Sequence, residues 1–193
     1  MTNRELTKKY WCFYLMLEKR FLSTVDFVEI DEKNFSTFSN EYALLLQATG
    51  AELDCFFKEY CGFNTDSRKS ITEYASFILT DYPDIISQVI NIKDTKIQLQ
   101  PFKNWNTSKP AQSLVWWEAF DKIKHDRYGS YKKANQENVL NTLSALFLLE
   151  MKCFKKFAQQ SEPDIPYKGS ELFSLVGWNT NAIPMKEAIA FIS

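Results

Sequence analysis

The segment from about Gln136 to Phe157 constrains the fold most, because a helix drawn through it is apolar on most of its circumference. Its apolar residues are Val139, Leu140, Leu143, Leu146, Phe147, Leu149, Met151 and Phe154. A helix with so little polar surface must be covered by other elements on most of its sides. The segment therefore predicts a helical bundle with this helix at its centre.

Further helices are indicated where apolar residues recur at steps of three and four. The predicted ranges are about Arg4 to Val28, Glu41 to Tyr60, Ile71 to Leu79, and Pro110 toward Gly129. Ser39 or Asn40 is placed to cap the second of these helices, and Gly62 to end it. Ser70 and Glu73 have the spacing of a capping box before the third helix.

Two stretches have the composition of short strands. Residues 89–102 (VINIKDTKIQLQPF) mix β-branched and polar residues around Lys93 and Asp94, and they predict a small β-hairpin. Leu172 to Val176 predicts another short strand. We expect a mainly α single domain over residues 1–193: a bundle of about five helices over about 4–160, wrapped by a C-terminal tail over 161–193.

Composition limits the kinds of partner. The 193 residues carry 23 basic and 24 acidic side chains, a formal net charge of −1, so no global field favours nucleic acid or an anionic membrane. Any such affinity must be local. With 5 glycines and no glycine fingerprint, a dinucleotide-binding or phosphate-loop enzyme is disfavoured.

The N-terminus and the cysteines indicate the compartment. The apolar stretch from Tyr10 to Leu17 is too short to span a bilayer and lacks a signal-peptide cleavage site, so we expect a cytoplasmic protein without a membrane partner. The 4 cysteines form no CxxC pair, and the sequence has 1 histidine that could join them as a metal ligand. We therefore expect reduced thiols, no metal and no cofactor.

The one histidine, His125, lies in a locally basic segment. From Asp121 to Lys133, five basic residues stand against two acidic ones, a surplus of three. The basic residues are Lys122, Lys124, Arg127, Lys132 and Lys133. Aromatic rings among these cations suit phosphates and unstacked bases. The alternative is a solvated histidine that is favoured by the C-terminal dipole of its helix.

A regular helix through this segment would separate its two main candidate groups. The projection sets Arg127 within the buried stripe and His125 on roughly the opposite side. The two could meet if the helix breaks near His125 or if two copies dock. Asp121 lies one turn before His125 and could orient it. Arg127 is then a hypothetical partner for Glu150, which projects close to the apolar stripe of its own helix.

The candidate binding surface combines an outer face of the helix with the residues that follow it. Trp117, Asp121, Lys124, His125 and Tyr128 form this outer face in projection. The candidate binding residues are Trp117, Asp121, Lys124, Tyr128, Tyr131 and Lys132.

The segment WWEAFDKIKHDRYGSYKKANQENVLNTLSALFLL, from Trp116 to Leu149, resembles the HEPN-like helical domains. The resemblance rests on a Trp-rich helix, then K-H-x-R, a short loop and a helix that opens A-N-x-x-N-V-L-N-x-L. It implies a dimeric, metal-independent ribonuclease of a defence or toxin–antitoxin system, with His125 and Arg127 as catalytic residues. Such nucleases carry R-x4-6-H, whereas here the order is Lys124, His125, Asp126, Arg127.

Two functional hypotheses follow from these observations. In the first, the chain is a helical domain that binds or cleaves RNA or nucleotides as a homodimer, with His125 as acid–base and Arg127 or Lys124 stabilising the phosphate. In the second, the same surface is a non-catalytic interaction or dimerisation module. The near-neutral charge and the reversed motif favour the second hypothesis.

Overall fold

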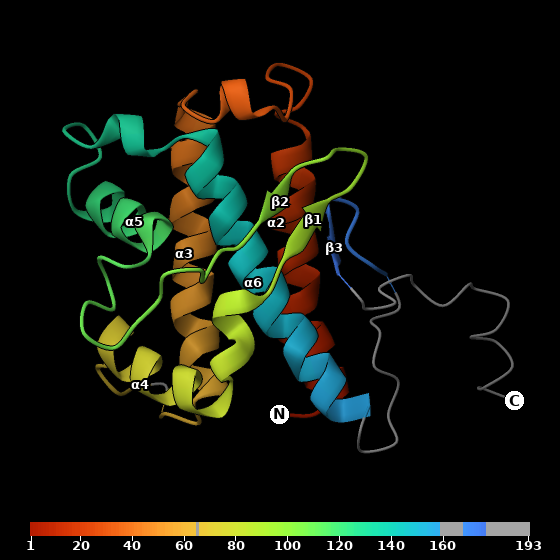
Figure 1. The fold of residues 1–193 in the computed structure, drawn as a ribbon, viewed down its shortest axis with the longest axis vertical. Coiled ribbons are helices and arrows are strands. Elements are labelled where there is room, and N and C mark those ends of the chain that lie inside the picture. Colours follow the sequence, from red (N-terminus) through yellow and green to blue (C-terminus); the bar gives the residue numbers. More distant parts are fainter. Residues whose placement is uncertain (65, 159–167, 177–193) are drawn as a thin grey trace, which may run out of the picture.

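The computed structural model describes residues 1–64, 66–158 and 168–176, and it has the predicted mainly α architecture with short accessory strands (Figure 1). The helices are α1 (Asn3–Leu6), η1 (Thr7–Trp11), α2 (Cys12–Leu22), η2 (Glu32–Asn34), α3 (Asn40–Tyr60), α4 (Ile71–Asp81), η3 (Pro83–Ser87), α5 (Val115–His125), η4 (Tyr131–Lys133) and α6 (Gln136–Ala158). The strands are β1 (Ile90–Ile92), β2 (Gln98–Leu99) and β3 (Phe173–Leu175). Helix α1, the π-helical η1 and α2 follow one another without a break.

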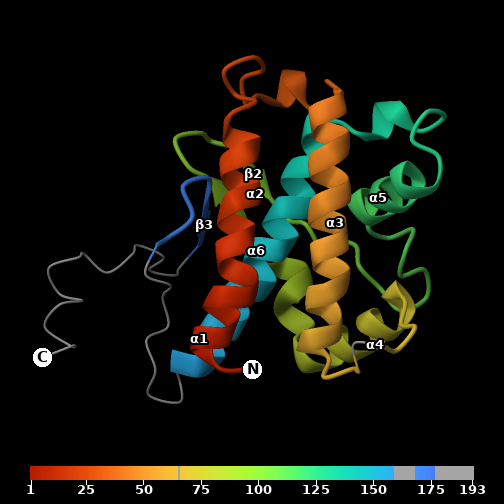
Figure 2. The same ribbon diagram turned by 180° about the vertical axis from the view of Figure 1, so that it is seen from behind.

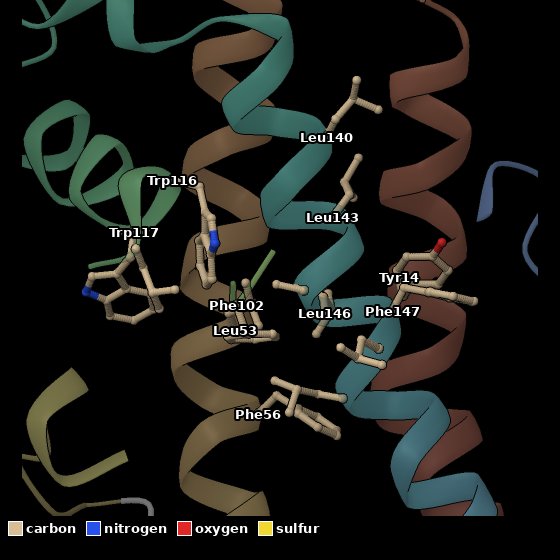
Figure 3. Packing of buried hydrophobic residues seen from close by; sticks show 14 of the residues in the cluster. Tyr14, Leu53, Phe56, Phe102, Trp116, Trp117, Leu140, Leu143, Leu146 and Phe147 are labelled. Carbon is tan, nitrogen blue, oxygen red and sulfur yellow. The ribbon is translucent and has the colours of Figure 1, made fainter. Parts of the chain in front are cut away.

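Helix α6 is the central element, as its apolar circumference predicts. It lies between α2 and α3 and contacts both (Figures 1 and 2). It also contacts α5, which in Figure 1 lies on the opposite side of α3 from α2. Figure 3 shows Leu146 and Phe147 of α6 among core residues from the surrounding elements. Every residue of α6 from Asn138 to Met151 is buried except Asn141.

Helix α5 approaches α3 closely because α3 has a glycine at the contact. A Cβ atom on Gly50 would overlap the ring of Phe120. A glycine inside a helix costs about 0.5–1 kcal/mol relative to alanine, and here it removes the atom that would hold the two helices apart. Gly50 thus sets the distance between α3 and the helix that carries His125.

The helix starts follow the predicted caps. Ser39 accepts a hydrogen bond from the Tyr42 amide at 3.0 Å and caps α3, and Ser70 with Glu73 forms the capping box of α4. Gly62 has a φ of +68°, the left-handed backbone of a residue that follows a helix end. The N-terminal helix ends at Leu22 instead of Val28. The cause is local: the Ser23 and Thr24 hydroxyls donate to preceding carbonyls and compete with the helix.

The aromatic helix begins later than predicted. The start near Pro110 is wrong, because α5 begins at Val115. The Asn106 side chain accepts hydrogen bonds from the amides of Ser108 and Lys109, at 3.1 and 2.9 Å. These side-chain turns hold the preceding segment in an irregular conformation until Leu114.

The three strands form one antiparallel sheet in the order β2-β1-β3. The predicted hairpin is β1 with β2, which pair Ile90 with Leu99, and the predicted strand near the C-terminus is β3, which pairs Phe173 with Ile92. Residues 159–167 and 177–193, which hold most of the expected tail, lie outside the described residues. The prediction of a single domain stays a prediction.

Glu18 of α2 anchors the segment before β3. Its carboxylate is buried and accepts hydrogen bonds from the Tyr14 and Ser170 hydroxyls and from the amides of Glu171 and Leu172. Several donors on one carboxylate compensate for its loss of water. A residue far back in the sequence thereby fixes where β3 joins the sheet. Within the described part of the chain, no helix is long and apolar enough to cross a bilayer.

Candidate functional site

The end of α5 is determined by a turn that Asp126 makes with its own backbone. Asp126 has φ −143° and ψ 80°, outside the helical region, and its carboxylate accepts a hydrogen bond from the Gly129 amide at 2.9 Å. A side chain on Gly129 would overlap that carboxylate. The Asp-x-x-Gly turn therefore replaces the next helical turn and ends α5 at His125.

The break brings His125 and Arg127 to the same hollow. Both residues line a pocket of about 550 Å³ between the last turn of α5 and the first turns of α3. The other lining residues are Asn40, Ala43, Leu44, Gln47, Ile123 and Lys124. The Arg127 guanidinium donates to Asn40 Oδ1 at 3.4 Å. The sequence left two ways for His125 and Arg127 to meet, a break in the helix or the docking of two copies. The structure has the break, within a single chain.

His125 and Asp121 form the pair that their spacing predicts. His125 Nε2 lies 3.3 Å from Asp121 Oδ1, one helical turn away, and the histidine side chain is 68% exposed. A carboxylate on one ring nitrogen fixes the orientation of the imidazole. The ring is thus held at the surface, where a solute can reach it.

Two cations, Lys124 and Arg127, share the hollow with His125, and neither has an acidic partner among the described residues. Lys133 pairs with Glu118 at 3.5 Å, so its charge is partly offset. Lys124 lies over the Phe120 ring, 5.8 Å from its centroid, and has no carboxylate within ion-pair distance in residues 1–64, 66–158 and 168–176. The exposed Lys132 and Arg127 are likewise unpaired there with any acid. Positive charge is therefore available to an anion at this end of α5.

The aromatic candidates have three different environments. Trp117 is only 8% exposed and packs against Phe57 and Phe120, so its expected position on an outer face is wrong. Figure 3 shows the ring of Trp117 below α5, to one side of Trp116. Tyr128 is 95% exposed, whereas the half-buried Tyr131 packs edge-on against Phe38 at 5.2 Å. Tyr128 is the ring that is open to a ligand.

The hypothetical pair of Arg127 and Glu150 is also wrong. Arg127 lies in the exposed turn after α5, because the helix does not continue to Tyr128 as the projection assumed. Glu150 is fully buried, and neither of its carboxylate oxygens has a hydrogen-bond partner among the described residues. Burial raises its pKa well above the ordinary value, and the negative charge of Glu52 raises it further. The site thus favours the neutral carboxyl group more than water does.

A second hollow of about 620 Å³ continues from the first along α3 and α5. Gln47 and Lys124 line both hollows, and the second also includes Asp121, Lys69 and part of Trp117. Sequence reasoning did not find Asn40 and Gln47, which contribute side-chain amides from α3. Their spacing of seven residues, two helical turns on one side of α3, is the signal that could have found them.

Comparison with protein-family models finds no match for the sequence, and searches among curated proteins and solved structures find none either.

Proposed function

We propose that the chain binds RNA or nucleotide phosphates in the hollow between α3 and the end of α5. One observation carries this proposal: the turn at Asp126 puts His125 and Arg127 on the same hollow, next to Lys124. Phosphate oxygens are bound by such cations through charge-assisted hydrogen bonds. The side-chain amides of Asn40 and Gln47 could donate to and accept from base edges, and the exposed ring of Tyr128 could stack on a base.

In the catalytic form of the proposal, the same residues cleave RNA without a metal. His125 would take the proton from a ribose 2′-hydroxyl, and the oxygen would attack the adjacent phosphorus to form a 2′,3′-cyclic phosphate. The bond to the 5′-oxygen would break, and that oxygen would leave as a hydroxyl with a proton from water. Asp121 would hold the imidazole in place, and Arg127 or Lys124 would stabilise the charge of the pentavalent phosphate. The contact between His125 and Asp121 and the availability of the two cations support this assignment.

Binding is tested by titrating the protein into a fluorescein-labelled single-stranded RNA oligonucleotide and following its anisotropy at two salt concentrations. We expect Arg127→Ala and Lys124→Ala each to weaken binding about three- to tenfold and to reduce the salt dependence. Lys96→Ala, which removes an exposed lysine of the β1–β2 turn, is the matched control. Equal affinities for all four proteins, or an equal loss in the control, would reject the site.

Cleavage is tested on the same oligonucleotide in the presence of a chelator. The catalytic form predicts cleavage by the wild type and none by His125→Ala, which should still bind through Arg127 and Lys124. Cleavage that survives His125→Ala would remove this histidine from the mechanism. Binding without cleavage would leave the phosphate-binding form of the proposal in place.

The second candidate is a non-catalytic interaction module that uses this surface to dock a protein. It is favoured by Tyr128, which follows Arg127 in the chain and whose ring is almost wholly exposed. This candidate predicts no affinity for RNA even at low salt, the condition under which phosphate contacts are strongest.

A further inference from the structure

We infer that the outer face of α2 and α3 is the interface between two copies of this chain. This inference goes beyond the proposed phosphate site and does not depend on it. In Figure 2, α2 and α3 run side by side at the front of the bundle, with α6 behind them. Their outward sides have the two properties that self-association needs: an apolar strip and complementary charge.

The apolar strip consists of large side chains that the bundle does not cover. Phe13 and Met16 of α2 and Leu44 of α3 are all exposed, Met16 to 49% and Leu44 to 53%. In projection Met16 points away from the buried stripe of α2, and Leu44 points away from the buried stripe of α3. Scattered exposed apolar residues are ordinary, but several large ones on the same side of two adjacent helices indicate an interaction surface.

The two helices have opposite charge. Between Asn3 and Leu22 the exposed charged residues are Arg4, Glu5, Lys8, Lys9, Lys19 and Arg20, a strongly basic set. The acidic residues of α3 are Glu41, Glu52, Asp54 and Glu59. Asp54 is paired with Lys58 at 3.1 Å and Glu41 with Arg20 of the same chain, so Glu52 and Glu59 are the acids of α3, and Lys8, Lys9 and Lys19 the bases of η1 and α2, that a second copy would meet. A face that is basic along one helix and acidic along its neighbour is complementary to a copy of itself, in which each basic helix meets an acidic one.

Charge fixes the orientation of the two copies. A twofold axis parallel to the helices places α2 of one copy opposite α3 of the other, whereas an axis perpendicular to them would place like charges together. A twofold axis parallel to the helices also leaves every residue at the same position along the helix direction in both copies. Within one chain α2 and α3 are antiparallel, with Arg20 bonded to Glu41 and the Tyr10 ring 4.9 Å from Phe56. Met16 of one copy then lies beside the partner's Leu44.

This orientation also predicts which cysteines meet. Cys12 and Cys55 are exposed, whereas Cys61 and Cys153 are buried. In projection Cys12 and Cys55 both point outward, and the antiparallel register sets them at nearly the same height. Cys12 of one copy therefore faces the partner's Cys55, twice per dimer. The same axis puts the two His125 hollows at one end of the dimer.

Cross-linking of the native thiols tests this arrangement. A short bismaleimide should join wild-type chains into a dimer through Cys12 and Cys55, because each thiol adds to one maleimide without oxidation. Cys12→Ser alone and Cys55→Ser alone should each give no cross-linked dimer, and an equal mixture of the two should give one. Cross-linked dimer in either single variant, or none in the mixture, would overturn the proposed orientation.

Sedimentation equilibrium tests the surface without relying on cysteine. We expect a wild-type dimer that dissociates as salt is raised, and a monomer for Met16→Lys. Val115→Lys, at a position 67% exposed on α5, is the matched control and should remain dimeric. A wild type that stays monomeric at low salt, or a Met16→Lys variant that stays dimeric, would refute the inference. Circular dichroism melting shows whether each variant is folded.

Charge reversal gives a second test, which holds even if one lysine substitution perturbs folding. A variant with Lys8→Glu, Lys9→Glu, Lys19→Glu and Arg20→Glu has two acidic helices, and a variant with Glu41→Lys, Glu52→Lys and Glu59→Lys has two basic helices. Neither should self-associate, and an equal mixture should form a heterodimer, because both halves of its interface again pair opposite charges. A mixture that stays monomeric would contradict the assignment.

Discussion

At the scale of single residues, Asp126 and Gly129 decide the chemistry of the candidate site. Asp126 leaves the helical region to accept the Gly129 amide, and α5 ends one residue before it. Without that turn the helix would carry Arg127 toward the core side and away from His125. A local side-chain hydrogen bond thus brings the two residues to the same hollow.

Glu150 provides a prediction at the same scale. Because its pKa is raised in the folded state, that state holds the proton more tightly than the unfolded chain does. The free energy of unfolding should therefore fall as pH rises above about 4.3, the ordinary value for glutamate, until the raised pKa is passed. Glu150→Gln cannot ionise. We therefore expect its free energy of unfolding to be about 1–3 kcal/mol higher than that of the wild type near neutral pH, and the difference to be smaller in acid.

Urea denaturation over a pH series measures this difference. Glu137→Gln, an exposed position at the start of the same helix, is the control and should change stability by less than about 1 kcal/mol. If the wild type and Glu150→Gln kept a constant difference at every pH, Glu150 would not be the titrating group.

At the scale of elements, α5 is positioned by its contact with α3, and Gly50 controls that contact. Gly50→Ala would ordinarily stabilise a helix by about 0.5–1 kcal/mol, but here the added methyl group meets the Phe120 ring. We expect a net destabilisation of about 1–3 kcal/mol, as for overpacking of a core, measured by denaturant unfolding. In Gly50→Ala combined with Phe120→Leu, part of that loss should return; a double variant no more stable than Gly50→Ala would point to another cause.

The anchor of β3 is a second prediction at this scale. Glu18→Ala removes the acceptor of the Glu171 and Leu172 amides, so these amides should exchange hydrogen faster, with a stability loss of about 2–4 kcal/mol. Hydrogen exchange followed by mass spectrometry measures the effect on the peptide that contains both residues. Lys19→Ala, the next residue and an exposed one, should leave their protection unchanged. Protection that is also unchanged in Glu18→Ala would show that the sheet holds this segment by itself.

The elements could be predicted where the signal is local. The caps at Ser39 and Ser70 and the all-round apolar pattern of α6 were sufficient to locate three helices. Helix ends were harder, because the turn at Asp126 and the hydroxyls of Ser23 and Thr24 compete with a pattern that still looks helical. The errors at Trp117 and Arg127 have different origins. Trp117 is covered by its contacts with Phe57 and Phe120. Arg127 leaves the projected stripe because the helix ends before it, at the turn that Asp126 makes.

At the scale of the whole molecule, the chain combines one buried central helix with surfaces of different kinds. The α2 and α3 face has exposed apolar side chains, and the hollow at the end of α5 has the cations Lys124 and Arg127 and the amides of Asn40 and Gln47 beside His125. The net charge of −1 reveals neither surface, because basic and acidic residues are nearly equal in number and yet lie on different parts of the molecule. The twofold arrangement would put two phosphate sites at one end, so a long RNA could contact both copies.

The presence of a single histidine makes the central claim measurable at one atom. The proton on Cε1 of His125 gives one resolved signal in a proton–carbon correlation spectrum, and that signal can be followed while a short single-stranded RNA is added. The proposed site predicts that the signal shifts and saturates at the same RNA concentration as the anisotropy titration, and that Arg127→Ala moves the saturation to higher concentration. A histidine signal that stays in place while the RNA is bound would show that RNA binds elsewhere on the molecule.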